Sequence, residues 1–331
     1  MHVRTESTGR SQSSRFTRMI ACFIGAAMLA SCAQGAQGTR PSSSVAPESA
    51  RAVYEPVIEI DDVYRFYQLY DSTSGQPTAE QLQQYIDTGS AGLRVFAEQR
   101  RTTGARIAEA IAKTPETFSQ ARRCVEPLPN VRRRLGDALA TLGRLYPDAR
   151  FPPVTIAIGR GKPVGIGSPV TGVQIGLEAL CATDFLNPDV EDRFVHVIAH
   201  EFVHVQQPTE TTDAKNPTVL EASLMEGSAE FVTELVSGNL ANAYLPAMAA
   251  DRELQIETAF LADKDKHDLS EWVGNSTPGQ PRDLGYWVGY RITKAYYQRA
   301  PDKQKALREI IGMRDAEAFL AASGWYPGMK L

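Results

Sequence analysis

The positions of apolar residues along the chain change character at residue 57. Residues 19–30 form one apolar stretch, and residues 33–56 then carry few large apolar side chains. Beyond that point, apolar side chains recur at the spacing of helices that bury one face. The pattern predicts helices over residues 63–70, 79–86, 90–113, 114–124, 131–145, 190–207, 217–237 and 283–299.

Two short runs follow the pattern of strands instead. Residues 151–158 have a Pro-Pro start and continue Val-Thr-Ile-Ala-Ile, and residues 173–177 form a second short run. Glycines punctuate the stretch between them, which predicts turns there. These elements predict an α+β fold that is mostly helical, with a helical lobe over residues 57–150. The candidate functional residues fall in the second part, residues 151–331.

Residues 1–31 are built like an export signal. Several arginines precede the apolar stretch, which is too short to span a membrane as a stable helix. It ends in Leu-Ala-Ser-Cys at residues 29–32, which resembles the lipobox of bacterial lipoproteins. That resemblance implies cleavage before Cys32 and a lipid anchor on it. With Ala33 next, it implies the bacterial cell envelope, at the outer membrane facing the periplasm; an ordinary secretory signal is the alternative.

Residues 32–56 are rich in Gly, Ser, Ala, Pro and Gln, and they predict a flexible tether because they bury too little apolar surface to fold. Residues 57–331 are long enough for one good core. With Cys32 used as the anchor and another cysteine in the signal, Cys124 and Cys181 remain. Export would permit a disulfide between them, and two unpaired buried thiols are the alternative.

Charge and glycine spacing argue against two classes of ligand. The formal net charge is −4, and no basic cluster is interleaved with aromatic residues, so nucleic acid is not expected as a partner. The glycine-rich stretch lacks both the lysine–hydroxyl spacing of a phosphate loop and a dinucleotide fingerprint, which argues against nucleotide binding.

The helix predicted over 190–207 contains the most informative motif, His-Glu-Phe-Val-His. Residues four apart lie on one face of a helix, so His200 and His204 can direct two imidazoles at one metal ion. Glu201 lies at the edge of the same site, where it could take a proton from a water molecule. His196 would stretch a three-histidine set over about 12 Å, which is poor for one tetrahedral ion. A core helix whose histidines only hydrogen-bond is the alternative.

Zinc in a catalytic site takes three protein ligands and keeps one position open. The helix predicted over 217–237, with Asn216 as N-cap and Gly238 as its stop, supplies carboxylates. Small and apolar neighbours surround Glu226, which favours a packed interface over a solvated acidic face, so we assign it as the third ligand. Glu230 is assigned to hold a ligand in place. Exchanged roles for these two glutamates are the alternative.

The motif and the downstream segment Met-Glu-Gly-Ser-Ala-Glu-Phe, residues 225–231, resemble the gluzincins, metallopeptidases with two histidines and one glutamate on zinc. More closely, the chain from about Ile58 onward resembles a bacterial family described as predicted zinc-dependent proteases. The resemblance implies a zincin-like core with a small sheet above the metal-binding helices. Residues 173–176 would be the sheet edge that pairs with substrate, and an ordinary hairpin is the alternative. No Gly-Ala-Met-Glu-Asn-type segment is present, which argues against aminopeptidase activity.

The helix predicted over 283–299 carries two Gly-Tyr pairs. Gly285 and Gly289 lie four apart on one face and permit close backbone packing against the metal-binding helices. Tyr286 or Tyr290 could then donate its phenol to the oxyanion of a tetrahedral intermediate. We assign Tyr286, with simple aromatic core packing as the alternative.

These assignments predict a lipid-anchored zinc peptidase that acts on a peptide or protein substrate. Zn²⁺ would be held by His200, His204 and Glu226, with Glu201 handling the proton. A non-catalytic zinc-containing scaffold or binding lipoprotein is one alternative, and a hydrolase of cell-wall amide bonds is another. Nothing in the sequence indicates an oligomeric state.

Overall fold

The computed structural model describes residues 54–276, 280 and 282–331. The chain divides into two units, Met1–Ala50 and Arg51–Leu331, and all the described residues lie in the second. The predicted signal over 1–31, the lipidation site Cys32 and all but the end of the predicted tether therefore lie outside the described residues. In the part of the chain that is described, no helix combines the length and apolar character needed to cross a bilayer.

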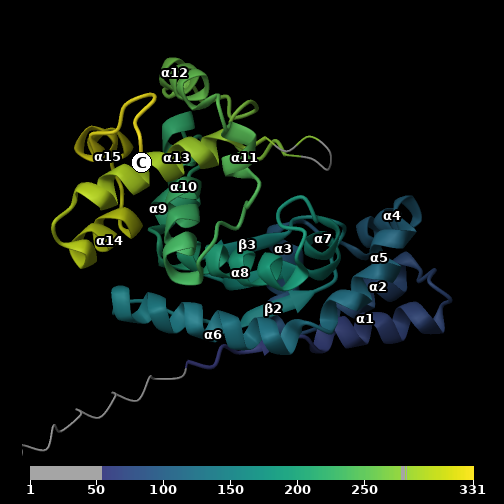
Figure 1. Ribbon diagram of the computed structural model, residues 1–331. Helices are drawn as coiled ribbons and strands as arrows, with labels where there is room; N and C mark the ends of the chain where they lie inside the picture. Colours follow the sequence, from purple (N-terminus) through teal and green to yellow (C-terminus); the bar gives the residue numbers. More distant parts are fainter. Residues whose placement is uncertain (1–53, 277–279, 281) are drawn as a thin grey trace, which may run out of the picture. The chain divides into compact units, whose positions relative to one another are not determined.

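The second unit is mostly helical and contains one small sheet, which confirms the expected α+β fold (Figure 1). In chain order the elements are β1 (Ile58–Glu59), α1 (Asp61–Ser72), α2 (Ala79–Asp87), α3 (Ala91–Gln99), α4 (Gly104–Lys113), α5 (Pro115–Ala121), the 3-10 helix η1 (Arg122–Val125), α6 (Leu128–Leu145), β2 (Val154–Ala157), β3 (Gly165–Ser168), β4 (Gly172–Gly176), α7 (Leu177–Ala182), α8 (Val190–Gln206), α9 (Thr209–Thr212), α10 (Val219–Ser237), α11 (Leu245–Ala249), α12 (Glu253–Asp263), α13 (Leu284–Arg299), α14 (Lys303–Ile311) and α15 (Ala316–Ser323).

The sheet has the order β1-β2-β4-β3. β1 and β4 run parallel to β2, whereas β3 runs antiparallel to β4. Among the described residues β3 is therefore an edge strand, and β4 is interior and buried at all of its positions. The expectation that residues 173–176 form the edge is wrong.

The edge strand comes from the glycine-rich stretch in which the sequence predicts turns. β3 lies directly on α8: a Cβ added to Gly167 would stand 2.0 Å from the carbonyl oxygen of Glu201. Only glycine permits this approach of strand to helix. Because glycine has no side chain, the strand also lacks the alternation of apolar and polar residues by which a strand is recognised in a sequence. The glycines that let β3 pack on α8 therefore make the strand hard to predict.

Helix α8 is the central element of the unit. It packs on β3 and β4, on α6 and on α10. Phe194, Ile198 and Phe202 of α8 are fully buried, and most of its other residues are buried as well. A helix that is buried on nearly every side has little room for polar groups, so the histidines that it carries need partners inside the protein.

The helix expected over residues 90–113 is divided into α3 and α4. Arg101 adopts a positive φ of 49°, which interrupts the helix. Thr103 then caps α4, because its hydroxyl accepts a hydrogen bond from the backbone N–H of Arg106. The apolar residues of the two helices follow one continuous helical spacing, which is why the sequence predicts a single helix. The positive φ of Arg101 changes the direction of the chain between them.

The helix expected from Asn216 begins later, after Thr218. The Thr218 hydroxyl accepts from the N–H of Glu221, and the Glu221 carboxylate accepts from the N–H of Thr218 at 2.7 Å. This reciprocal capping box satisfies two backbone donors and outcompetes the single cap that Asn216 could give. The helix ends at Gly238, as expected, with φ of 94°.

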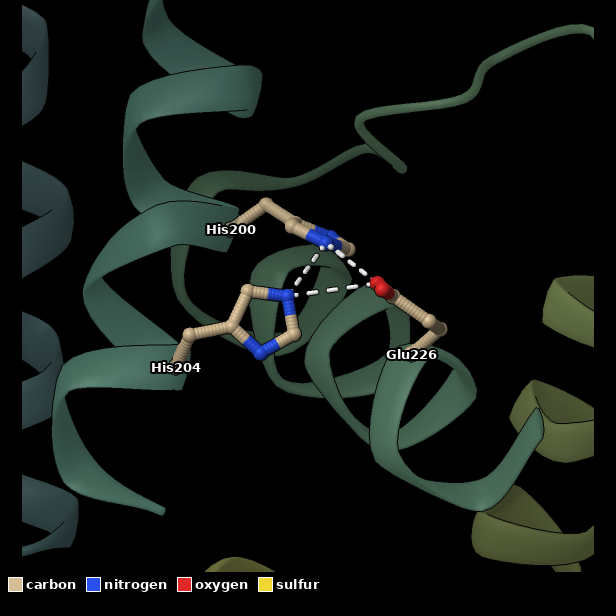
Figure 2. A group of neighbouring side chains, drawn as sticks. All are labelled: His200, His204 and Glu226. Atoms are coloured by element: carbon tan, nitrogen blue, oxygen red, sulfur yellow. Dashed lines mark hydrogen bonds and ion pairs between the residues drawn. The ribbon is translucent and has the colours of Figure 1, made fainter. Parts of the chain in front are cut away.

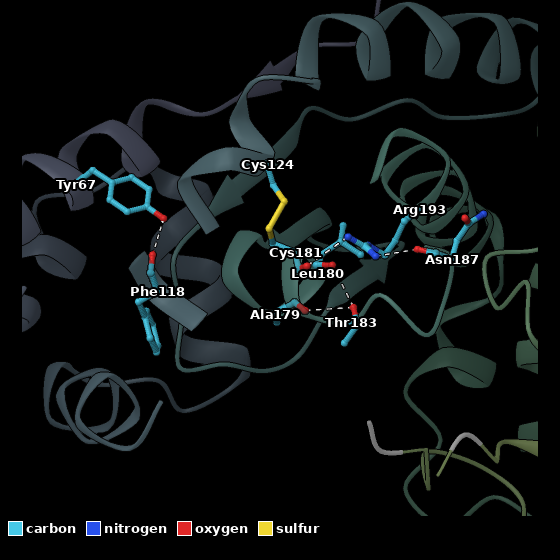
Figure 3. Close-up of a disulfide and its surroundings, with 9 residues drawn as sticks. All are labelled: Tyr67, Phe118, Cys124, Ala179, Leu180, Cys181, Thr183, Asn187 and Arg193. Atoms are coloured by element: carbon cyan, nitrogen blue, oxygen red, sulfur yellow. Dashed lines mark hydrogen bonds between the residues drawn. A yellow bond between two sulfur atoms is a disulfide. The ribbon is translucent and has the colours of Figure 1, made fainter. Parts of the chain in front are cut away.

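A disulfide joins Cys124 of η1 to Cys181 of α7 (Figure 3). Beyond it, the buried Arg193 of α8 donates hydrogen bonds to the carbonyl oxygens of Cys181, at 3.2 Å, and Asn187, at 2.7 Å. The two cysteines are 57 residues apart in the sequence. A disulfide that closes a loop of this length lowers the conformational entropy of the unfolded chain and so destabilises the unfolded state by about 4 kcal/mol. The disulfide fixes α7 to the preceding helices, and Arg193 connects α7 to the first turns of α8.

Helices α10 and α13 meet through glycines at van der Waals distance. A Cβ on Gly227 would lie 2.1 Å from the backbone nitrogen of Tyr290, and one on Gly289 would lie 1.8 Å from the carbonyl oxygen of Ser223. Both obstructions are backbone atoms, which cannot swing aside as side-chain ends can. The contact confirms the close packing predicted from the Gly-Tyr pairs.

Replacing Gly289 with alanine should therefore force α10 and α13 apart and lower the free energy of unfolding by about 3 kcal/mol. Gly143→Ala on α6 is the matched control, since its Cβ would meet nothing nearer than 3.6 Å. That control should be neutral or stabilising by up to about 1 kcal/mol, because alanine is the better helix former. Urea unfolding measures both variants, and an equal effect at the two glycines would contradict the tight crossing.

Candidate metal centre

Helix α8 brings His200 and His204 to one face in the protein interior. Their exposed fractions are 6% and 7%. The helix is capped at its start by Asp189, whose carboxylate accepts from the N–H of Asp192, and it ends where Gln207 turns to extended backbone. These boundaries leave both histidines well inside a regular helix, so the four-residue spacing acts as the sequence predicts.

Glu226 on α10 completes a compact group with these two histidines (Figure 2). The two Nε2 atoms lie 3.0 Å apart. Glu226 Oε2 lies 3.2 Å from Nε2 of His200 and 3.2 Å from Nε2 of His204. The three ligand atoms thus form a nearly equilateral triangle that faces inward between α8 and α10.

The triangle is close to the size that zinc requires. Bonds of about 2.0–2.2 Å in tetrahedral geometry separate neighbouring ligand atoms by about 3.3–3.5 Å. The observed separations of 3.0–3.2 Å come within a few tenths of an ångström of that range. Two imidazole nitrogens and one carboxylate oxygen also suit zinc better than magnesium or calcium, which prefer oxygen ligands alone. The residues present therefore fit a zinc ion.

The electrostatics of the group favour a positive charge between the three side chains. Burial by itself would lower the pKa of His200 and of His204, but their contacts with Glu226 raise both above the ordinary value. Burial alone would raise the pKa of Glu226, and the two histidines lower it far below its usual range. Without a metal ion, protons on the two histidines supply this positive charge. A divalent cation bound between the three side chains would supply it instead.

Glu230, one helical turn beyond Glu226, lies behind His200. Its Oε1 is 3.4 Å from Nδ1 of His200, and its Oε2 accepts from the backbone N–H groups of Ala241, at 2.9 Å, and Asn242. A carboxylate on Nδ1 directs Nε2 toward the metal position and makes the imidazole a better ligand. The structure thus places Glu226 at the triangle and Glu230 behind it, in the arrangement that the sequence analysis assigned.

Gln207 contacts the imidazole of His204 from the side opposite the triangle, a role that no motif in the sequence indicates. Its Oε1 lies 2.7 Å from Nδ1 of His204, and its amide nitrogen donates to the carbonyl of Met225 and to the hydroxyl of Ser228. It thereby links the end of α8 to α10. The signal in the sequence is its position, three residues after a ligand histidine and at the end of the helix, where a side chain can turn back toward the ring.

Glu201 lies beside the triangle, against the edge strand. A Cβ added to Gly165 would come within 2.5 Å of Glu201 Oε1, so the carboxylate fills the space that the glycine leaves open. Burial raises the pKa of Glu201, and the charges of His204 and His200 oppose that rise. A carboxylate with a raised pKa is the better proton acceptor near neutral pH.

Tyr286 and Tyr290 of α13 have different surroundings. The Tyr286 ring is stacked on that of His200, with centroids 6.3 Å apart and planes inclined by 17°. Burial raises its pKa well above the usual value, and Glu226 adds to the rise, so the phenol keeps its proton. The Tyr290 hydroxyl donates to Glu234 at 2.8 Å instead. Of the two tyrosines, Tyr286 is the one beside the triangle.

His196 is not part of the group. Its Nδ1 lies 2.8 Å from the hydroxyl of Ser237, and its ring is buried between α8 and the end of α10. Burial lowers its pKa, so the neutral ring is favoured. Its contact is a core hydrogen bond, as expected of a histidine one turn outside the site.

Comparison with known proteins bears on this site directly. The model of a family described as "Predicted Zn-dependent protease (DUF2268)" matches residues 180–318. No curated protein and no solved structure matched the chain. The matched segment includes α8, α10 and α13, and hence the three side chains of the triangle together with Glu201 and Tyr286. Over the part of the chain that carries the metal group, the protein is similar to a family of predicted zinc-dependent proteases.

Proposed function

We propose that the protein is a zinc-dependent peptidase of gluzincin type. The observation that carries this proposal is the inward-facing triangle of His200, His204 and Glu226, with ligand atoms 3.0–3.2 Å apart. The description of the matching family supports hydrolysis of peptide bonds as the reaction. The His-Glu-Phe-Val-His motif places a carboxylate at the edge of the same site.

When bound, zinc supplies a Lewis acid that lowers the pKa of water and polarises the scissile carbonyl. Glu201 then accepts the proton of the attacking water and delivers it to the leaving amine. Tyr286 donates a hydrogen bond from its phenol to the oxyanion that forms on the carbonyl oxygen. Glu230 and Gln207 hold the two imidazoles in orientation through Nδ1.

We propose that the substrate backbone binds along the edge of β3. The strand carries Gly165, which adjoins Glu201, and its outer side has no strand partner among the described residues. An extended peptide can add to such an edge through main-chain hydrogen bonds, with no requirement for a given side chain. This places the peptide bond next to the carboxylate that handles the proton.

A scaffold role for the site is the second candidate. A structural zinc site is closed by four protein ligands, whereas the described residues offer a group of three. The open position favours catalysis. Hydrolysis of a cell-wall amide would use the same metal group and differ only in the pocket around it.

We further propose that the protein acts at the cell envelope, anchored through a lipid on Cys32. The Leu-Ala-Ser-Cys sequence supports the anchor. The disulfide between Cys124 and Cys181 supports an exported location, because disulfides persist mainly in oxidising compartments. The long polar segment before residue 57 would give the folded unit reach from the membrane.

Zinc-loaded protein should cleave members of a mixed peptide library, and a chelator should stop the cleavage until zinc is restored. Mass spectrometry of the products gives the bonds cut. A parallel incubation with cell-wall fragments tests the amide alternative. If neither substrate is cleaved and a fourth side chain closes the coordination of the bound zinc, the scaffold role replaces the peptidase.

A further inference from the structure

The loop between β2 and β3 is held rigidly beside the proposed active site. Glu178 of α7 is fully buried, and its carboxylate accepts from the backbone N–H of Gly159, at 3.0 and 3.1 Å, and of Gly161, at 2.9 Å. At the other end of the loop, Gly165 adjoins Glu201. The backbone of this loop is therefore anchored at Gly159 and Gly161, and the loop continues to the strand that adjoins Glu201.

Two cations of the loop face two more on α4 across a surface groove. The groove has a volume of about 450 Å³. It is lined by Arg106, Glu109, Ala110, Lys113, Arg160 and Lys162. Four of these side chains are cationic and one is acidic, so positive charge predominates in the groove although the formal net charge of the chain is −4.

In the described part of the chain, the four cations lack acidic partners. Among the described residues, no carboxylate lies within 4.0 Å of the charged atoms of Arg106, Lys113, Arg160 or Lys162, and Glu109 is likewise unpaired. The two arginines donate only to backbone carbonyls, Arg106 to that of Arg101 and Arg160 to that of Arg100. Arg106 and Lys113 are two turns apart on the same face of α4.

Arg160 has one hydrogen-bonding group that the described residues leave unsatisfied. Its Nε is buried and has no hydrogen-bond partner among the described residues. Because Nε is covered by the protein, a ligand in the groove would engage the guanidinium through its terminal nitrogens, where a carboxylate can bind at two points. Arg100, whose carbonyl Arg160 contacts, also interacts electrostatically with Glu201. The cationic surface thus continues to the edge of the site.

We propose that this groove, through Arg160 and Lys162, binds a carboxylate of the peptide substrate close to the scissile bond. The inference rests on the proposed peptidase function and specifies its substrate class as acidic peptides. The carboxylate comes either from an Asp or Glu side chain or from the carboxyl end of the peptide. Arg160 and Lys162 precede Gly165, the first residue of β3, so we expect the groove to contact one side of the scissile bond only. A strand added antiparallel to β3 presents its C-terminal residues there.

Matched peptides test this. They share one cleavable core and carry Glu, Gln or Lys two to four residues from the bond, on either side, with free or amidated carboxyl ends. We expect kcat/KM for the Glu peptide to exceed that of its Gln twin on the order of tenfold on one side of the bond. The double variant Arg160→Gln, Lys162→Gln should bring that ratio toward one. The amidated peptides show whether side chain or carboxyl end is bound.

The control removes two cations elsewhere. Arg133→Gln combined with Arg144→Gln on α6 makes the same change in net charge, and neither residue lines the groove. It should leave the Glu-to-Gln ratio unchanged. If the control variant lowers the Glu-to-Gln ratio as much as the groove variant does, general electrostatic attraction accounts for the preference. Binding of the carboxylate in the groove is then refuted.

A binding measurement separates failure of the groove from failure of the peptidase. Fluorescence anisotropy compares labelled Glu and Gln peptides on the zinc-loaded Glu201→Gln protein. Equal binding of the two, together with equal cleavage by the unmodified protein, overturns the acidic-substrate inference and leaves the peptidase standing. Absence of all cleavage counts against the peptidase, and preferential binding of the Glu peptide would then still support the groove.

Discussion

Replacing Glu201 with glutamine should reduce peptide hydrolysis by about 10²- to 10⁴-fold while leaving one zinc ion bound per chain. Glutamine keeps the size of the side chain against Gly165 but cannot accept and return a proton. Because Glu201 lies outside the triangle of ligand atoms, its removal takes nothing from the metal. Peptide cleavage measured beside zinc content by atomic absorption checks both halves of the expectation.

Glu191→Gln is the matched control for this variant. It makes the same substitution on the same helix, in the first turn, where Glu191 lies 3.7 Å from Arg134 and far along α8 from the histidines. Its activity should stay within about twofold of the unmodified protein, since a surface ion pair contributes little. Full activity of Glu201→Gln would remove Glu201 from the reaction, and loss of zinc would instead make it a metal ligand.

Replacing Glu226 with glutamine should weaken zinc binding by at least about 100-fold. The loss should exceed the 10- to 100-fold that removal of a residue behind a ligand typically costs. Glutamine removes the anionic oxygen that both histidines contact and leaves two neutral imidazoles as ligands. Competition with a zinc-binding dye gives the affinity. Zinc that binds only the native state stabilises the folded protein. This stabilisation should decrease together with the zinc affinity.

Two further glutamates on α10 make this test selective. Glu234→Gln is the control, because Glu234 is engaged with Tyr290 and Lys294 and not with the triangle; zinc affinity should be unchanged. Glu230→Gln should weaken zinc binding less than Glu226→Gln does, since Glu230 acts through His200. The reverse ranking would show that the two glutamates exchange roles in solution.

The residues of the candidate site were largely predictable because their spacing encodes their geometry. Four residues along a helix return a side chain to the same face, so His200 and His204 converge whatever the rest of the fold does. The assignment of Glu226 needed more, namely the small residues around it, which predict a close contact with another helix. The structure supplies that contact at Gly227 and Gly289.

The sheet was the least predictable part of the fold. The edge strand β3 consists of Gly-Ile-Gly-Ser, a sequence whose turn propensity is stronger than its strand propensity. Strand order depends on which segments meet in space, and nothing local records it. The same holds for Gln207, whose role depends on its reaching His204 and α10 at once.

The sequence alone determined what short-range physics controls: the helices with their apolar faces, and the two histidines on one face with a glutamate beside them. The export signal at the start of the chain stays a prediction. Only the tertiary structure decided which carboxylate joins the histidines, which tyrosine stacks on His200, which strand forms the edge, and that Cys124 pairs with Cys181. It also brought α4 and the β2–β3 loop together as a cationic groove. These are contacts between segments far apart in the chain, and they form only when packing of the whole core brings the segments together.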